Sequence, residues 1–154
     1  MTDDIFLGLA VEQARIGLSE GGIPIGAALV VDGQVVAVGH NRRVQDGSAI
    51  HHGEMNALER AGRLTADVYA RAVMYTTLSP CHMCAGAMLL YGIRRVVVGE
   101  NRTFMGAEDL LRSHGVEVTV VDSPECSLLL QQFIAENPTL WNEDIGIVED
   151  SVGS

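Results

Sequence analysis

Two short segments of the chain contain residue types that could hold a metal ion and move a proton: His52-Gly53-Glu54 and Pro80-Cys81-His82-Met83-Cys84. Zinc binds imidazole nitrogen and thiolate sulfur, and a catalytic zinc site keeps three protein ligands and one position for water. His52, Cys81 and Cys84 form such a set of three. We therefore expect one Zn²⁺ per chain at these side chains.

Glu54 follows His52 by two positions, so its carboxylate is expected to touch the bound water rather than the metal. Zinc lowers the pKa of that water toward neutrality. A neighbouring carboxylate can then take its proton and deliver it to a substrate, as hydrolytic deamination requires. The two segments match the H-x-E and P-C-x-x-C signature of zinc nucleobase deaminases. We therefore predict that Glu54 is the catalytic acid and base.

Two other interpretations of the cysteine pair exist, because a C-x-x-C alone also occurs in redox proteins and structural zinc sites. A thioredoxin-like redox role would leave His52 and Glu54 without a function. A closed structural site needs a fourth ligand, for which His51, His82 and Cys126 are the candidates. We expect His51 in a loop or at the surface, His82 pointing away from the ion, and Cys126 as a small buried apolar residue.

Composition and charge narrow the class of protein. The chain has 154 residues, of which 47% are hydrophobic and 19% charged, which favours one domain over residues 1–154 with a real core. Twenty acidic residues against ten basic ones give a net charge of −10. Phosphate contacts require a basic surface, so we expect a small-molecule substrate and no nucleic-acid partner.

Nothing in the sequence predicts a membrane segment or secretion. No apolar run is long enough to span a bilayer, and the chain begins with the acidic stretch Met1-Thr2-Asp3-Asp4. Three cysteines is an odd number, which fits reduced thiols better than a disulfide framework. These features favour a cytoplasmic protein without membrane contact.

The hydropathy pattern predicts alternating helices and strands. A first helix is expected from Asp3 or Asp4 to about Glu20, and its buried face is expected to carry Phe6, Leu9, Ala10, Ala14 and Leu18. Strands at 25–31 and 34–39 flank an Asp32-Gly33 turn, and a polar loop follows to about residue 50. Further strands are expected at 73–77, 95–98 and 116–121, and further helices at 52–61, 81–91, 107–113, 124–135 and 140–144.

This order predicts an α/β fold, specifically a three-layer α/β/α sandwich in which helices flank a mixed five-stranded sheet. Continuous apolar runs such as Val96-Val97-Val98 suit strands that are buried on both faces. The opening hairpin favours a mixed sheet over a purely parallel one. Residues from about 147 to 154 are expected to form a flexible acidic tail.

From about Glu12 to Gly146 the chain resembles the cytidine and deoxycytidylate deaminase superfamily, and within it the small cytosine deaminases of the fungal type. The resemblance implies a cytidine deaminase-like fold, a homodimer, and conversion of free cytosine to uracil and ammonia. The matching segments include Glu20 to Gly26, Gly39-His40-Asn41, Gly47-Ser48-Ala49, His52 to Glu54, Tyr75 to Cys84, Tyr91 to Ile93, Val98 to Asn101, and Trp141 to Gly146.

The same resemblance implies how the base would be held. The side-chain amide of Asn41 and the backbone N–H of Gly53 would bind the carbonyl oxygen of the base. The backbone carbonyl of Ser79 and the carboxylate of Asp144 would accept from its exocyclic amine. Three apolar side chains would enclose the ring: Phe104, Trp141 and Ile25.

Three alternatives stay open from the sequence. Guanine or another aminated heterocycle could be the substrate, because His51, His82 and the residues after Gly146 depart from the fungal pattern. An RNA-acting adenosine deaminase would share both motifs, but such enzymes commonly have Glu-Pro-Cys where this chain has Ser79-Pro80-Cys81, and they need a basic face. A non-enzymatic zinc module is the third alternative, in which the ion would be required for folding.

Overall fold

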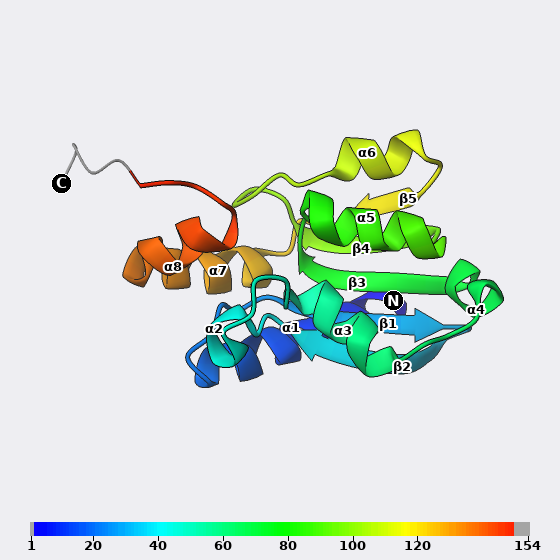
Figure 1. Ribbon diagram of the computed structural model, residues 1–154, viewed down its shortest axis with the longest axis horizontal. Helices are drawn as coiled ribbons and strands as arrows, with labels where there is room; N and C mark the ends of the chain where they lie inside the picture. Colours follow the sequence, from blue (N-terminus) through cyan, green and yellow to red (C-terminus); the bar gives the residue numbers. More distant parts are fainter. Residues whose placement is uncertain (1, 150–154) are drawn as a thin grey trace.

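The computed structural model describes residues 2–149 (Figure 1). The strands are β1 (Gly26–Val31), β2 (Gln34–His40), β3 (Ala72–Leu78), β4 (Arg95–Glu100) and β5 (Glu117–Val120). The helices are α1 (Thr2–Ser19), α2 (Arg43–Asp46), α3 (Gly53–Ala61), α4 (Ala66–Ala70), α5 (His82–Tyr91), α6 (Glu108–Ser113), α7 (Pro124–Glu136) and α8 (Pro138–Asp144).

The five strands form one mixed sheet in the order β2-β1-β3-β4-β5. Strand β1 pairs antiparallel with both β2 and β3, whereas β3, β4 and β5 run parallel to one another. The Asp32-Gly33 hairpin joins the two antiparallel strands, and both residues have the positive φ that this turn requires. The prediction of a mixed five-stranded sheet is confirmed.

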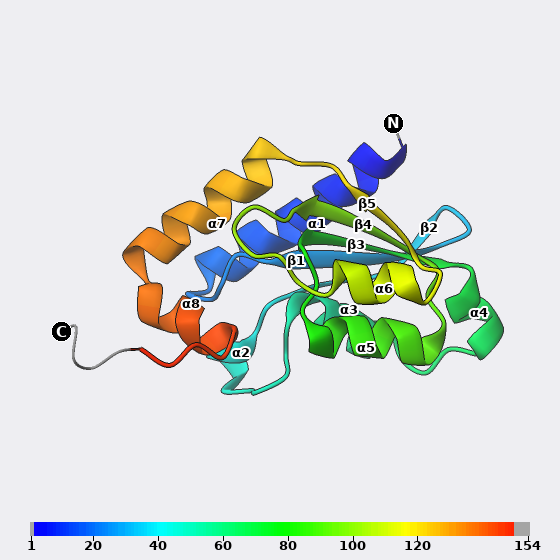
Figure 2. The same ribbon diagram turned by 90° about the horizontal axis from the view of Figure 1, so that it is seen from above.

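Alternation along β1 divides the core between the two faces of the sheet. Ala27, Leu29 and Val31 pack under α3, α5 and α6, and Ala28 and Val30 pack against α1. Seen from above, α1 and α7 cover one face, and α3, α5 and α6 cover the other (Figure 2). The three-layer α/β/α sandwich is therefore confirmed.

Helix α1 approaches β1 so closely that only glycine fits at position 26. A Cβ atom on Gly26 would lie 1.9 Å from the carbonyl oxygen of Ala10. The buried face of α1 differs from the prediction, because Leu7 and Val11 are buried, Phe6 and Leu9 are only partly buried, and Leu18 is 40% exposed. In the last turn of α1 the buried position is taken by Gly17.

Two short helices, α2 and α4, were not predicted from the sequence. Helix α2 has four residues and α4 five, too few for hydropathy to show a helical period. Thr65 caps α4 by accepting a hydrogen bond from the backbone N–H of Val68, which is the one local signal of this helix. The loop predicted from His40 to about Ile50 thus contains one helical turn, and its first residue, His40, ends β2.

Among residues 2–149, the structure contains no helix with both the length and the apolar character needed to cross a membrane. The prediction of a single domain over residues 1–154 stays a prediction. The predicted tail falls partly outside the described residues, because only 147–149 of it are described and these form no helix or strand.

Candidate active site

The predicted zinc ligands lie at the starts of two helices. His52 is the N-cap of α3 and Cys81 is the N-cap of α5, both with extended backbone, and Cys84 follows in the first turn of α5. The positive end of the α5 dipole and its free N–H groups favour the thiolate form of cysteine. The two helices lie on the same face of the sheet, so their N-termini bring the three side chains together (Figure 1).

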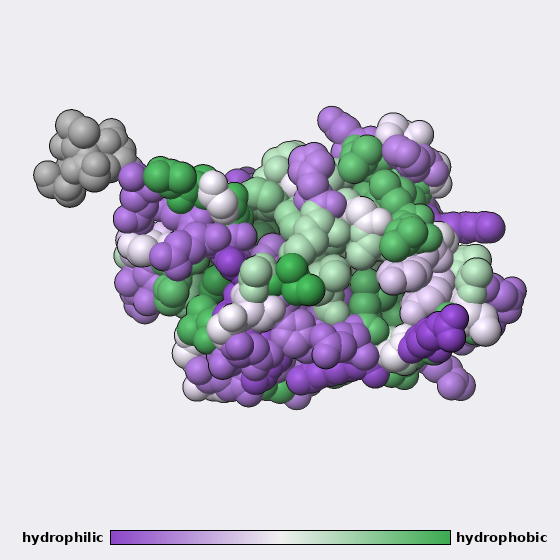
Figure 3. Space-filling model, viewed as in Figure 1, coloured by the Kyte–Doolittle hydropathy of each residue, from purple (hydrophilic) through white to green (hydrophobic). Residues whose placement is uncertain are grey.

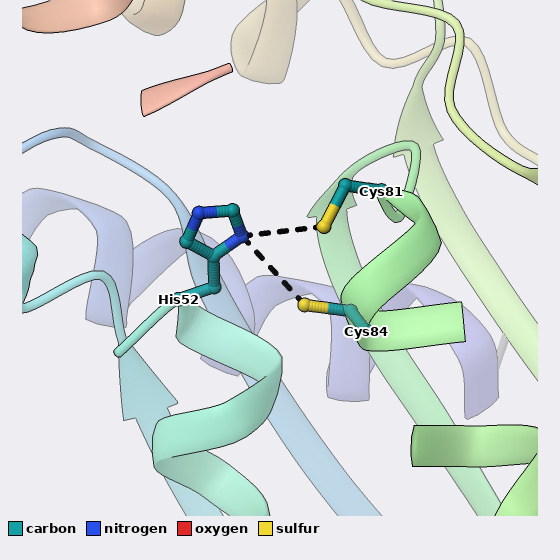
Figure 4. A group of neighbouring side chains, drawn as sticks. All are labelled: His52, Cys81 and Cys84. Carbon is teal, nitrogen blue, oxygen red and sulfur yellow. Dashed lines mark hydrogen bonds between the residues drawn. The ribbon is translucent and has the colours of Figure 1, made fainter. Parts of the chain in front are cut away.

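Their spacing fits one zinc ion. Nδ1 of His52 lies 3.5 Å from Sγ of Cys81 and 3.7 Å from Sγ of Cys84 (Figure 4). All three atoms lie within 4.8 Å of one another. Ordinary zinc–nitrogen and zinc–sulfur bonds at a tetrahedral angle would separate nitrogen from sulfur by about 3.6 Å. The three donors are therefore already placed as a zinc site requires.

The fourth-ligand candidates lie elsewhere. His51 binds the carboxylates of Asp46 and Glu59, at 2.7 and 2.9 Å. The side chain of His82 is exposed and Cys126 is buried in α7. In residues 2–149, no fourth His, Cys, Asp or Glu joins the cluster, so the site keeps the open position of a catalytic centre.

Charge at the cluster favours metal binding by Cys81. Hydrogen bonds from Cys84 and His52 lower the pKa of Cys81 to about 4, against the effect of burial. Burial lowers the pKa of His52, but the hydrogen bond to Cys81 and the charges of Asp144 and Glu54 outweigh it and raise the pKa to about 9. The hydrogen bond between Cys84 and Cys81, together with burial, raises the pKa of Cys84 well above its usual range.

Nε2 of His52 faces away from the sulfur atoms and lies 3.5 Å from Oδ2 of Asp144. A carboxylate on this side favours the imidazole tautomer with its proton on Nε2 and its lone pair on Nδ1, the atom that faces the cysteines. Asp144 therefore has a contact with the metal-binding residues that the sequence did not predict.

Glu54 lies beside this cluster and is only 4% exposed. Burial raises the pKa of Glu54 to about 7, while the charge of His52 acts in the opposite direction. A carboxyl group with a pKa near neutrality can both accept and donate a proton, which is what general acid–base chemistry needs.

Glu54 lines a pocket beside the three metal-facing side chains. Of the predicted site residues, nine line this cavity: Ile25, Asn41, His52, Glu54, Ser79, Cys81, Phe104, Trp141 and Asp144. Leu78 and Ile145 also line it and were not predicted. Residues separated by most of the chain therefore surround one pocket that includes the metal-facing side chains of His52 and Cys81.

Two further predicted site residues, Gly53 and Cys84, lie next to the cavity but do not line it. Cys84 is fully buried. A Cβ atom on Gly53 would lie 3.2 Å from the carbonyl oxygen of Ile25 and 3.5 Å from the backbone nitrogen of Asn41. The absence of a side chain at position 53 therefore lets α3 begin close against Ile25, which precedes β1, and Asn41, which follows β2.

Asn41 is fully buried, and its side-chain amide faces the C-terminal helix. Its Nδ2 donates to both carboxylate oxygens of Asp144, at 3.2 and 3.3 Å. Oδ1 of Asn41 accepts from the backbone N–H of Arg43 at 3.0 Å, which fixes the orientation of the amide. The group expected to bind the carbonyl oxygen of a base and the group expected to bind its amine are thus hydrogen-bonded to each other.

Sequence reasoning missed Glu108, a buried carboxylate behind Ser79. Glu108 is 2% exposed, and its Oε2 accepts from the Ser79 hydroxyl at 2.6 Å. The other oxygen accepts from Asn101 at 3.3 Å, and the Ser79 hydroxyl accepts from Gly106 at 2.9 Å. These bonds hold the strand end at Ser79 to the loop that carries Phe104. In the sequence, Glu108 and Asp109 follow a glycine and an alanine, and nothing in this pattern indicates that Glu108 is buried.

Helix α8 supplies the last wall of the cavity. Trp141 is 6% exposed, and its ring meets that of Phe104 edge to face with 6.2 Å between centroids. Ile23, Ile25, Leu78, Leu130 and Phe133 complete the apolar cluster beneath it. Trp141 and Phe104 are therefore part of a packed cluster as well as of the cavity lining.

Comparison with known proteins identifies the family. The profile of the cytidine and deoxycytidylate deaminase zinc-binding region matches residues 1–100. This match includes both segments with the metal-facing residues. The chain belongs to the cytidine and deoxycytidylate deaminase family, whose matched region is zinc-binding, and His52, Cys81 and Cys84 are placed so that they could hold the ion.

Individual relatives extend over most of the chain. A cytosine deaminase from Candida albicans is 55% identical over 141 residues, which are 91% of this chain and 94% of that protein. A tRNA-specific adenosine deaminase from Bacillus subtilis is 31% identical over 144 residues, covering 87% and 89% of the two chains. A solved structure from work on A-to-I editing by tRNA:A34 deaminases has a TM-score of 0.70 at 29% identity, over 82% of this chain and 99% of that one.

Proposed function

We propose that this protein is a zinc-dependent hydrolase that converts free cytosine and water to uracil and ammonia. The observation that carries the proposal is the position of buried Glu54 beside the three zinc-facing donors, in a cavity closed by Phe104 and Trp141. The cytosine deaminase relative, at 55% identity, supports cytosine over other bases.

One Zn²⁺ per chain would be held by Nδ1 of His52 and by Sγ of Cys81 and Cys84. When bound, zinc supplies a Lewis acid that lowers the pKa of water and makes it a nucleophile near neutral pH. Asp144 keeps the His52 lone pair on the side of the cysteines, and the start of α5 favours their thiolate form.

Glu54 would move the protons of the reaction. Its carboxylate takes a proton from the attacking water and passes it to the ring nitrogen beside the reacting carbon. The second proton of that water then travels through Glu54 to the amine, which leaves as ammonia. One carboxyl group can do both because its pKa, about 7 through burial, permits either protonation state near neutrality.

The other cavity residues would recognise the base. Asn41 and the backbone N–H of Gly53 donate to its carbonyl oxygen. The carbonyl of Ser79 and the carboxylate of Asp144 accept from its amine. Phe104, Trp141 and Ile25 enclose the ring, where aromatic stacking contributes affinity. Closure by Phe104, Trp141 and α8 would leave no space for a sugar, so cytidine is expected to react far more slowly than cytosine.

The decisive experiment measures ammonia release by Glu54→Gln, with Glu12→Gln as the control at another glutamate. Glu12 is exposed on α1. We expect Glu54→Gln to lose about 10³-fold or more in kcat, because general acid–base groups contribute 10²–10⁴-fold, while Glu12→Gln stays near wild type. Equal rates for Glu54→Gln and wild type would exclude the role given to Glu54. A panel of cytosine, guanine, adenine and cytidine ranks the substrates.

A second candidate, deamination of adenosine in RNA, is favoured by the relatives named as tRNA-specific adenosine deaminases. The net charge of −10 argues against it, since phosphate binding requires cationic surface. We propose that the protein does not bind nucleic acid. A gel shift with transfer RNA at low salt tests this, and tight, salt-sensitive binding would favour the RNA substrate.

We also propose that the protein is a homodimer. A groove between α3, α4 and α5 is lined by apolar side chains, including Leu90 at 75% exposure and Ile50 at 56%. Figure 3 shows hydrophobic residues gathered over α5. Exposed apolar surface of this kind marks interaction sites. Light scattering tests the assembly, and Leu90→Glu should give a monomer; a monomeric wild type would contradict it.

The cysteines support placement in the cytoplasm. All three are free of disulfide bonds, and two of them face a common metal position, where oxidation to a disulfide would prevent metal binding. Fractionation of cells expressing the tagged protein tests this proposal, and recovery from an oxidising compartment with Cys81 joined to Cys84 would contradict it.

A further inference from the structure

Arg43 lies outside the cavity lining but contacts both of its polar walls. Its backbone N–H donates to Oδ1 of Asn41 at 3.0 Å. Its guanidinium reaches α8, where Nη1 lies 3.2 Å from Oδ1 of Asp144 and donates to the carbonyl oxygen of Glu143 at 3.0 Å. Nε donates to the carbonyl oxygen of Ala49 at 3.0 Å. One residue therefore connects the start of α2, the following loop and the C-terminal helix.

The burial of Asp144 makes this contact significant. The side chain of Asp144 is 2% exposed and that of Arg43 24%. A buried carboxylate is costly unless a cation and hydrogen-bond donors compensate it. Arg43 is the permanently charged partner of Asp144, because an arginine does not lose its proton in proteins. His52, whose Nε2 lies 3.5 Å from Oδ2 of Asp144, is instead an uncharged imidazole when its Nδ1 binds a metal.

Binding of a base in the cavity would remove part of the hydrogen bonding that stabilises the buried carboxylate of Asp144. In the structure, Asn41 donates to both oxygens of Asp144. A base that takes a hydrogen bond from Asn41 and donates its amine to Asp144 competes with this pairing. The Arg43 contact approaches Oδ1 from outside the cavity, so it can persist while the base is bound.

We infer that Arg43 is the positioning residue that holds Asp144 and helix α8 in the substrate-accepting arrangement. This inference rests on the proposed function for its kinetic consequence. The guanidinium presents several donors in a rigid fork, and here they serve three carbonyl or carboxylate groups from two segments. A lysine ammonium keeps the charge but lacks the fork. Arg43→Lys is therefore expected to hold Asp144 and α8 only partly in place.

The test compares Arg43→Gln and Arg43→Lys with Arg42→Gln. Arg42 is a matched control, because its side chain is 25% exposed and it binds Glu20 and Asp46 rather than α8. For cytosine we expect Arg43→Gln to raise KM about tenfold or more with a smaller change in kcat, as loss of a charged hydrogen-bond partner implies. Arg43→Lys is expected to lie between, and Arg42→Gln within about twofold of wild type.

A second readout does not depend on catalysis. Trp141 is the single tryptophan of the chain and lies on α8. Arg43→Gln should shift its emission to longer wavelength and increase its quenching by acrylamide, while Arg42→Gln should leave both unchanged. If Arg43→Gln does not fold, the comparison of Arg43→Lys with Arg42→Gln replaces it.

The outcomes separate the inference from the proposed function. Wild type that releases no ammonia from cytosine, together with a Trp141 change only in the Arg43 variants, contradicts the function and supports the positioning role. Active wild type with Arg43 variants that match Arg42→Gln in KM and in Trp141 emission overturns the inference. A lowered melting temperature with unchanged KM and emission also overturns it, because the role would then be structural only.

Discussion

The hydroxyl of Ser79 donates a 2.6 Å hydrogen bond to the buried carboxylate of Glu108, at the point where β3 ends. Glu108 also accepts from Asn101, so both of its oxygens face donors. In Glu108→Gln one of these donors would face an amide N–H₂ instead. An unmatched buried donor costs about 1–3 kcal/mol.

We therefore expect Glu108→Gln to lower kcat/KM for cytosine about tenfold, which corresponds to 1.4 kcal/mol, while zinc stays at one per chain. Asp109→Asn is the control, since Asp109 is the exposed neighbour on the same helix. Kinetics and metal analysis of both variants check this prediction. An unchanged kcat/KM in Glu108→Gln would show that the Ser79 carbonyl needs no such support.

Zinc uptake should release protons. With its pKa raised to about 9 mainly by Cys81 and nearby carboxylates, His52 is protonated at pH 7.5 in the metal-free protein. Cys84 is a thiol, because its pKa is raised, whereas Cys81, with a pKa of about 4, is already a thiolate. Binding should therefore release about two protons per zinc. Calorimetry in buffers of different ionisation enthalpy measures this number.

The same protons set the pH dependence of zinc affinity. Because bound protons compete with the metal, apparent affinity should rise with pH, steeply below about 9 and less steeply above it, where His52 has lost its proton and Cys84 still carries one. Competition with a chelator between pH 6 and 9 follows this rise, and a flat profile would contradict the protonation states given above.

The Phe104 ring should contribute to substrate affinity. It lines the cavity and packs against Trp141 edge to face. Stacking of an aromatic side chain on a base is worth about 1–3 kcal/mol, so Phe104→Ala is expected to raise KM for cytosine about tenfold or more. Met105→Ala is the control, because Met105 is the adjacent residue and is 62% exposed. Equal KM values for the two variants would show that Phe104 serves packing alone.

The N-terminal helix is held by a charge cluster far from the site. Asp3 accepts from Arg95 at 2.7 and 3.0 Å and from the Tyr75 hydroxyl at 2.7 Å. The Arg95 hydrogen bonds lower the pKa of Asp3 from 3.8 to about 2. The stabilisation is therefore present above pH 3.8 and is lost as pH falls toward 2.

Asp3→Asn should lower the unfolding free energy by about 1 kcal/mol at neutral pH, after allowance for solvent screening. The difference from wild type should shrink as pH falls below 3.8. Asp4→Asn controls for the helix dipole, because Asp4 lies in the same first turn and is exposed. Urea unfolding at several pH values measures both, and a difference that persists at low pH would exclude the ionised Asp3 as its source.

The metal-binding part of the site was predictable because its signals are local. His52 and Glu54 share one helix start, Cys81 and Cys84 another, and each spacing has few chemical uses. Strand alternation and turn residues likewise predicted the sheet and its hairpin. Prediction of Asn41, Phe104, Trp141 and Asp144 depended on a family resemblance, since nothing in their local sequence differs from ordinary loop or core positions.

The remaining contacts join residues that no local pattern connects. Arg43 and Asp144 are separated by 101 positions, and Ser79 and Glu108 by 29. Each pair forms only when the sheet brings two segments to the same edge, so periodicity and propensity carry no information about it. The missed helix α2 belongs to this group, because its first residue, Arg43, is held between Asn41 and the C-terminal helix, and the helix has no buried apolar stripe.

The order of the chain has a consequence for how the enzyme matures. The ribosome completes His52, Cys81 and Cys84 well before it reaches α8 at residues 138–144. A nascent chain therefore has every donor for the ion while Trp141 and Asp144 are still missing. Zinc can therefore bind during synthesis before α8 covers the site. A zinc ion covered by α8 would afterwards exchange with solvent only as fast as that helix detaches.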